Sequence, residues 1–130
     1  AGVLTSLCTV SLLSSLFQLT HEEYVTLLPK SITTAIGMGL SKESGGYVTI
    51  TVAVIILTGV LGNMFCEIIC KVTGITHPVA KGIAIGTSSH AIGTARAMQL
   101  GEVEGAMSGL SIVISGIITL IGAQIFAGFI

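Results

Sequence analysis

Long apolar runs alternate along the chain with short stretches rich in glycine, serine and threonine. The runs cover residues 1–19, 47–70 and 105–130, and Glu67 is the only acidic or basic residue within them. A helix needs about 20 apolar residues to cross the hydrocarbon core of a bilayer, and each run meets that length. The pattern predicts about three full transmembrane helices in an all-α, polytopic membrane protein.

Two shorter elements separate these runs, and neither resembles an ordinary membrane span. Residues 31–41 cover roughly 16 Å as a helix, about half of a bilayer. They follow a short helix that a capping box at 20–23 starts and Pro29 ends, and on which Tyr24 suits the headgroup level. Residues 79–99 are long enough to cross but are interrupted by glycines and hydroxyl groups. Backbone that ends at membrane depth is tolerated only where protein buries it or where it lines a wet cavity, so we expect broken or re-entrant helices.

A weak internal repeat relates the two halves. Shifting the chain by 56 positions superimposes residues 35–37 on 91–93, both of which read Ala-Ile-Gly. The shared order of a short polar element, a glycine turn and a long apolar run predicts repeats over 31–70 and 87–128 within one membrane domain, 1–130. The repeats are inverted if both short elements re-enter from the side on which they start, and parallel if both cross. Paired, glycine-interrupted short segments are typical of a transporter's binding site.

Composition narrows the class of protein. Of 130 residues, 52% are hydrophobic and 8% are charged, whereas soluble domains carry about 25% charged residues. A net charge of −1 without a basic patch argues against a nucleic-acid partner. The three cysteines lie inside apolar runs, and an odd, buried set does not form a disulfide framework. The expected surroundings are a lipid bilayer.

Neither an enzyme nor a metal centre is predicted. Residues 88–90 read Ser-Ser-His, but adjacent residues seldom place a hydroxyl correctly against an imidazole, and no acid lies nearby to orient the histidine. Cys66, Cys70 and His77 lack a fourth ligand for a zinc site. We therefore expect no catalytic residues, no metal and no cofactor.

The polar segments suit a small carboxylate, which needs hydrogen-bond donors, a positive end and dry surroundings. Helix N-termini near 30–31 and 86–87 would supply unpaired N–H groups, and glycines let backbone approach a ligand closely. The candidate substrate-binding residues are Lys30, Ser31, Thr33, Thr34, Gly86, Thr87, Ser88, Ser89, His90, Gly93, Thr94 and Arg96. Close helix packing is the alternative for the small residues. It is the role expected of the Gly-x-x-x-Gly patterns, formed by Gly82, Gly101, Gly105 and Gly109.

Three ionisable residues have specific functional hypotheses. His90 is a functional candidate because it lies inside a membrane element, as a donor to a carboxylate or a carrier of a coupled proton. The alternative is a neutral imidazole bonded to a backbone carbonyl or a hydroxyl. Arg96 can clamp a carboxylate through two hydrogen bonds, can pair with Glu102 or Glu104, or can simply mark the cytoplasmic side. Lys30 is a weaker candidate for the same role of binding a carboxylate. In the alternative interpretation its side chain extends to the membrane–water interface.

Three motifs in order closely resemble the LrgB/CidB family: LPKSITT at 28–34, GIAIGTSSHAIGTARA at 82–97 and LGEVEGA at 100–106. The resemblance implies a multi-pass protein of the bacterial inner (cell) membrane, linked to control of murein hydrolase activity and cell lysis and described as antiholin-like. Family members are longer, so the chain is expected to be the C-terminal portion of one. Ala35 stands where the family pattern usually has proline, which implies a softer break in the first short element.

The resemblance also implies two functions that the sequence does not separate. Plant relatives move glycolate and glycerate across the plastid envelope, and bacterial relatives are implicated in pyruvate uptake with a small membrane partner, LrgA or CidA. One expectation is therefore a transporter of small monocarboxylates, working as a homo-oligomer, with an LrgA/CidA-like partner, or both. The other is a non-transporting, antiholin-like regulator that acts by assembly with that partner. A pore without a selective site is a third interpretation.

Overall fold

The computed structural model describes residues 1–129 and is all-helical, as predicted. Residue 130, the last of the predicted helix 105–130, lies outside the described residues. Six α-helices and one 3₁₀ helix follow in the order α1 (Gly2–Leu16), α2 (His21–Leu27), α3 (Thr34–Glu43), α4 (Val48–Val72), α5 (Pro78–Leu100), α6 (Glu102–Phe126) and η1 (Ala127–Phe129).

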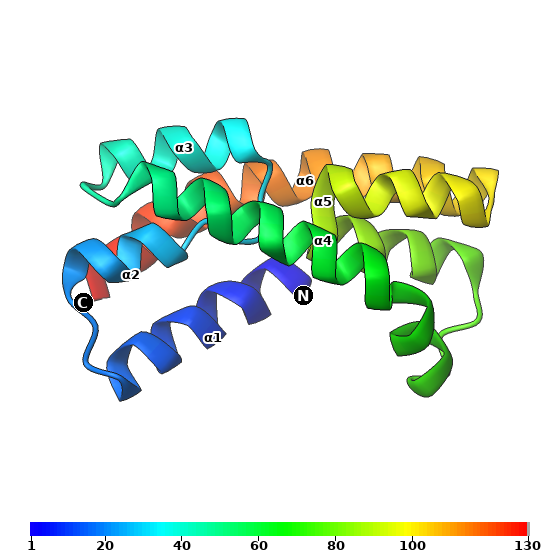
Figure 1. The fold of residues 1–130 in the computed structure, drawn as a ribbon, viewed down its shortest axis with the longest axis horizontal. Helices are drawn as coiled ribbons and strands as arrows, with labels where there is room; N and C mark the ends of the chain where they lie inside the picture. The colour runs from blue at the N-terminus through cyan, green and yellow to red at the C-terminus, as the bar shows by residue number, and fades with distance from the viewer. Residues whose placement is uncertain (130) are drawn as a thin grey trace.

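The two long helices α4 and α6 run in opposite directions along the long axis of the molecule (Figure 1). Both are long and apolar enough to cross a membrane. Many of their apolar side chains point outward, and Leu57 and Ile121 are 58% and 61% exposed. Water-soluble proteins rarely leave a large continuous apolar surface uncovered, so these outer faces suit lipid.

The first predicted span is shorter than expected. α1 ends at Leu16, and the chain leaves the helix through Gln18, whose φ is 53°. Its 15 residues within this sequence cover about 22 Å. Within residues 1–129, two helices rather than three have the length of a complete crossing.

Helices α2 and α3 form a helical hairpin, the first hairpin. α2 begins at the predicted capping box: Thr20 Oγ1 accepts a hydrogen bond from the Glu23 amide, and the Glu23 carboxylate accepts one from the Thr20 amide. α2 runs from one end of the molecule to its middle, and α3 runs back to the same end (Figure 1). Residues 28–33 form the turn between them, the first apex.

Helix α5 also folds back on itself, and its turn is at His90. There φ is 44° and ψ is −135°, which splits α5 into a first limb, 78–89, and a second limb, 91–100. A Cβ placed on Gly93 would lie 3.3 Å from the carbonyl oxygen of Ile85, whereas a straight helix separates such residues by about 12 Å. This second hairpin starts and ends at the other end of the molecule, and its turn, the second apex, lies near the middle (Figure 1).

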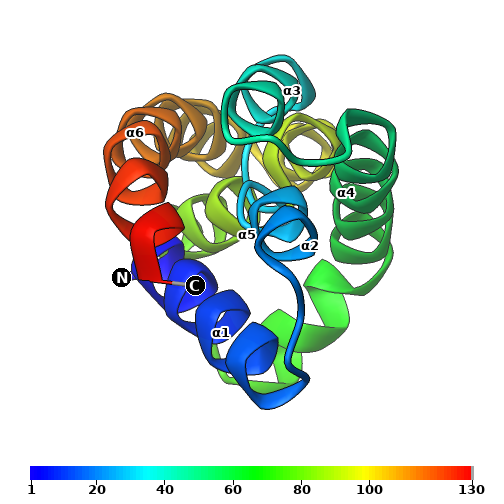
Figure 2. The same cartoon turned by 90° about the vertical axis from the view of Figure 1, so that its left-hand side faces the viewer.

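The first hairpin carries the most buried large side chain. Figure 2 shows α2 near the centre of the bundle, among α1, α3, α4 and α6. Tyr24 has 0% exposed surface, and its hydroxyl donates to the Phe126 carbonyl oxygen at 2.8 Å and lies 2.8 Å from Ser11 Oγ. Protein covers the whole Tyr24 side chain, so Tyr24 does not meet lipid headgroups directly, and its depth at the headgroup level stays a prediction.

Glycines bring α6 against the first limb of the second hairpin. A Cβ on Gly82 would lie 2.5 Å from the Glu104 carbonyl oxygen, and a Cβ on Gly86 would lie 2.9 Å from Ser108 Cα. Both obstacles are backbone atoms, which cannot rotate aside. The close approach of these two helices therefore requires glycine at both positions.

The remaining glycines of the Gly-x-x-x-Gly patterns differ in what they contact. A Cβ on Gly105 would lie 3.1 Å from the Cα of Met98, so Gly105 packs against the second limb. Gly101 meets only the side chain of Glu104, and Gly109 faces open space. Sequence spacing alone therefore does not reveal which glycines make helix contacts.

We predict that Gly82→Ala destabilises the protein and that Gly109→Ala does not. The new methyl group at position 82 would overlap backbone, and overpacking of this kind costs about 1–3 kcal/mol. Alanine at position 109 has room and gains up to about 1 kcal/mol of helix propensity. Thermal unfolding of both variants in one detergent measures the difference. An unchanged midpoint for Gly82→Ala would contradict the close contact.

Candidate functional site

The two apices meet inside the bundle. Lys30 lies in the first apex and His90 forms the second. The backbone of Lys30 hydrogen-bonds the imidazole of His90, and the Lys30 ammonium lies close enough to act on it electrostatically. Both are predicted site residues, and the fold brings them together from opposite halves of the chain.

His90 is buried and held in an unfavourable backbone conformation. The residue is 4% exposed, and its Nε2 has no hydrogen-bond partner among the described residues. Its positive φ is readily adopted by glycine, whereas a residue with a Cβ pays about 1–3 kcal/mol. A histidine that served only to fill space would have both ring nitrogens satisfied. This backbone strain and the unpaired nitrogen mark His90 as a functional candidate.

Lys30 brings a half-buried positive charge to the same place. Its Nζ donates to Ser31 Oγ at 3.3 Å, and Ser31 Oγ lies 2.7 Å from Ser6 Oγ on α1. Within residues 1–129 the Lys30 ammonium forms no ion pair with a carboxylate. A charge withdrawn from water without a counter-ion is costly, so this environment favours an anion beside Lys30.

Several other predicted residues lie at or next to the apices. Thr33 is the N-cap of α3 without a side-chain cap, and Thr34 is the first residue of that helix. Thr87 and Ser88 donate to carbonyl oxygens one turn earlier in their own limb, a common bond for hydroxyls in helices. Ser89 is buried, with its Oγ 3.1 Å from Ser88 Oγ. Thr87 and Ser88 therefore already have hydrogen-bond acceptors within the helix.

The second limb is fixed to the bend and to α6 by one threonine. Thr94 Oγ1 donates to the His90 carbonyl oxygen at 2.8 Å and lies 2.6 Å from Ser108 Oγ. Gly93 packs against the first limb, and Gly86 packs against α6. These three predicted site residues thus hold the second apex in shape.

Arg96 lies apart from the apices. It forms an ion pair with Glu67 of α4 and donates to Gln99 Oε1 at 2.7 Å. The predicted pairing with Glu102 or Glu104 is wrong, because the second limb packs against α4 at this level while those carboxylates begin α6. Glu67 was missed as a partner, although an acid inside a long apolar run is itself a signal.

Two glycines of α4 leave room for the second apex. Neither was predicted from the sequence as part of the site. A Cβ on Gly62 would overlap Ser89 Oγ, and a Cβ on Gly59 would lie 2.8 Å from Ile92 Cδ1. Their spacing of three within an apolar run is the only signal that the sequence carries for this contact. α4 thus forms one wall of the second apex.

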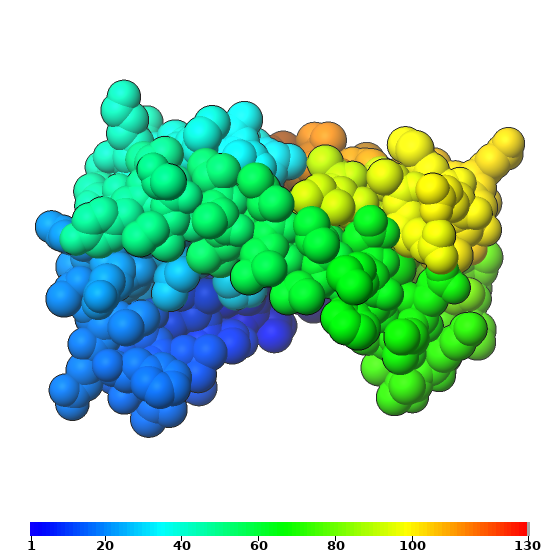
Figure 3. Space-filling view, viewed as in Figure 1, coloured from blue at the N-terminus to red at the C-terminus, as the bar shows by residue number. Residues whose placement is uncertain are grey.

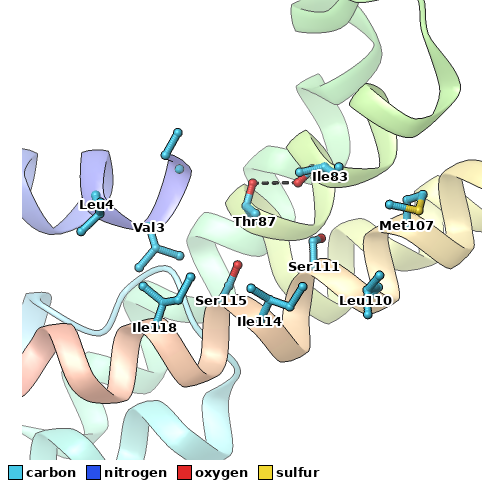
Figure 4. Close-up of a pocket in the computed structure, with 12 residues that line it drawn as sticks. Val3, Leu4, Ile83, Thr87, Met107, Leu110, Ser111, Ile114, Ser115 and Ile118 are labelled. Atoms are coloured by element: carbon cyan, nitrogen blue, oxygen red, sulfur yellow. Dashed lines mark hydrogen bonds between the residues drawn. The ribbon is translucent and has the colours of Figure 1, made fainter.

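A cavity of about 300 Å³ opens beside the second hairpin, between α1, α5 and α6. Figure 4 shows mostly apolar walls, to which Thr87 and Ser115 add hydroxyl groups. The molecule as a whole is also hollowed on one side, between α1 and the C-terminal part of α4 (Figure 3). Neither His90 nor Lys30 lines the cavity, so the cavity adjoins the apices without containing their charges.

The profile of the LrgB-like family matches residues 1–129. The chain belongs to the LrgB-like family. It is 36% identical over 118 residues to the holin-like protein CidB of Staphylococcus epidermidis, which covers 91% of this chain and 52% of that protein. It is 35% identical over 130 residues to the antiholin-like protein LrgB of Bacillus subtilis, covering 100% and 56% of the two chains. No solved structure matches the chain.

Family membership indicates what kind of protein this LrgB-like chain is. The long apolar helices and the family together make it a membrane protein. Its relatives are named for holin-like and antiholin-like behaviour rather than for an enzymatic activity, which agrees with the expected absence of catalysis. The chain spans about half the length of the curated relatives that it matches.

We predict opposite effects of glycine at two neighbouring positions. At position 90 the positive φ favours glycine, so His90→Gly should be more stable than His90→Ala by about 1 kcal/mol or more. At Ala91, which is helical and exposed, Ala91→Gly should lose about 1 kcal/mol. Chemical or thermal unfolding in detergent measures both differences. Equal stability of the two His90 variants would show that the backbone there is unstrained.

Proposed function

We propose that this protein moves small monocarboxylates such as pyruvate, glycolate or glycerate across the bacterial cell membrane, and that the carboxylate binds where the two apices meet. One observation carries the proposal: the backbone of Lys30 hydrogen-bonds the buried imidazole of His90, whose Nε2 is unpaired, and the Lys30 ammonium beside this contact has no acidic partner within residues 1–129. A carboxylate accepts hydrogen bonds from the Lys30 ammonium and supplies the missing negative charge, while the free Nε2 of a neutral imidazole can accept a hydrogen bond from a hydroxyl of the cargo.

The charge balance at the apices supports a monoanion. Lys30 carries one positive charge, and the ion pair between Arg96 and Glu67 is already neutral. A cargo with one carboxylate would leave the apices neutral, whereas a dicarboxylate would add an uncompensated negative charge in a poorly solvated place. The small size of the proposed acids also suits a site enclosed by glycine-packed helices.

We further propose that the halves, 31–70 and 87–128, are an inverted repeat with re-entrant hairpins. Matched contacts that cross between the halves support this. Ile92 of the second hairpin lies against Gly59 of α4, and Ile36 of the first hairpin lies against Gly116 of α6. Each isoleucine thus meets a glycine on the long helix of the other half, as a two-fold axis requires.

Contacts inside each hairpin repeat as well. A Cβ on Gly37 would lie 3.6 Å from the Pro29 carbonyl oxygen, and the corresponding distance from Gly93 to the Ile85 oxygen is 3.3 Å. Both pairs span eight residues and follow the 56-position shift. Inverted repeats with interrupted helices at mid-membrane are the architecture of many secondary transporters, so this geometry favours alternating access around the apices.

A second candidate function is regulation by assembly with an LrgA/CidA-like partner, linked to control of murein hydrolases and cell lysis. The names of the relatives favour it. So does an open groove on the outside of α6, where Gly109 contacts nothing and Gly105 and Ala106 leave a shallow, small-residue surface. Gly109→Leu would then disrupt co-purification with the partner while leaving uptake by the isolated protein unchanged.

For transport we expect that Lys30→Gln and His90→Asn each reduce uptake of dilute pyruvate or glycolate about tenfold or more. Loss of a charge-assisted hydrogen bond costs about 1.5–3 kcal/mol, and 1.4 kcal/mol is a factor of ten. Asparagine, like histidine, carries a Cβ, so the backbone cost of the bend should be about the same in the second variant. The measurement is initial uptake of labelled acid into proteoliposomes that contain the complete protein.

The matched control is Lys42→Gln, which removes a lysine from the exposed end of α3. It should transport as the wild type does. Wild-type uptake by folded Lys30→Gln and His90→Asn proteins would remove the proposed site.

A further inference from the structure

A single face of helix α1 contacts the first apex and the first limb of the second hairpin. Ser6 Oγ lies 2.7 Å from Ser31 Oγ at the first apex. A Cβ on Gly2 would lie 3.2 Å from Thr87 Oγ1, one turn before the second apex. Gly2 and Ser6 are four residues apart, so they lie one above the other on the helix. α1 is therefore a third wall where the two hairpins meet, beside the walls formed by α4 and α6.

Ser6 ends a chain of hydrogen bonds that begins at Lys30. An ammonium group only donates, so Lys30 Nζ donates to Ser31 Oγ. The positive charge polarises the Ser31 hydroxyl and makes it a better donor to Ser6 Oγ. Ser31 is buried and Ser6 is half-buried, so little water competes for these bonds. The hydroxyl of Ser6 thereby holds Ser31, and Ser31 holds the ammonium.

We propose that Ser6 is a positioning residue of the carboxylate site, which acts on the cargo through Ser31 and Lys30. This inference rests on the proposed function. An ordered lysine loses much rotamer freedom, and an ammonium fixed before the cargo arrives binds an anion more tightly than a mobile one. Ser6 does not touch the carboxylate, so its removal should weaken binding and leave the maximal transport rate nearly unchanged.

The first test measures uptake kinetics of the complete protein in liposomes. Ser6→Ala should raise the KM for pyruvate about five- to tenfold, the loss expected for one hydrogen bond of ordinary strength, with a maximal rate within about twofold of the wild type. Ser6→Thr retains the hydroxyl and should keep a KM near the wild-type value. Ser15→Ala makes the same chemical change on the exposed side of α1 and should have no effect.

The second test needs no transport and therefore separates this inference from the proposed function. A small amine-reactive reagent labels lysines in the reconstituted protein, and mass spectrometry follows each site. Ser6→Ala should change the labelling rate of Lys30 by about threefold or more, while the rate at exposed Lys42 stays constant.

The combined outcomes are decisive. An unchanged KM in Ser6→Ala overturns the inference even if Lys30 labelling changes, because the position of the ammonium then does not affect the cargo. Unchanged labelling overturns it as well, since Ser6 then does not hold Lys30. Failure of the wild type to take up any of the acids removes the proposed function instead, and the labelling result still decides whether Ser6 fixes the ammonium.

Discussion

The whole structure depends on the burial of helix ends that stop in the middle of the bundle. A helix end leaves backbone N–H and C=O groups unpaired, and lipid offers them no partners. The fold meets this constraint by turning both apices toward each other and closing α1, α4 and α6 around them. Thr94 satisfies the carbonyl of His90, and the imidazole of His90 satisfies backbone of Lys30. Glycines are needed at these contacts, because the surrounding helices must come close enough to the helix ends for backbone to touch backbone.

The same constraint explains why the apices are chemically unequal. Under the 56-position shift, Lys30 corresponds to Gly86 and His90 corresponds to Thr34. Gly86 must be small because the backbone of α6 passes over it, whereas Lys30 lies where there is room for a long side chain. One apex can therefore carry a charge and the other an imidazole on a strained bend. The proposed repeat would therefore be symmetric in its backbone and asymmetric in the groups that would meet a ligand.

Much of this fold was predictable because the length and polarity of each segment are local properties. The capping box at Thr20 acts within a few residues, and the apolar runs of α4 and α6 are each one continuous stretch of sequence. The bend at His90 was not predictable to the residue, because no proline or glycine marks it. The partner of Arg96 depends on which helix packs against the second limb, which is a tertiary property. Of the site, the sequence indicated Lys30 and His90 separately, and only the fold shows that they adjoin.

The hydrogen bond from Tyr24 to the carbonyl of Phe126 joins residues 102 positions apart. It ties the first hairpin to the end of the last long helix, and the second hairpin likewise needs the glycine contacts of α6. A ribosome makes α6 after both hairpins, so neither apex has its full cover when it first emerges. Both apices therefore gain their full cover only when α6 is in place, and a chain without α6 would leave them without that wall.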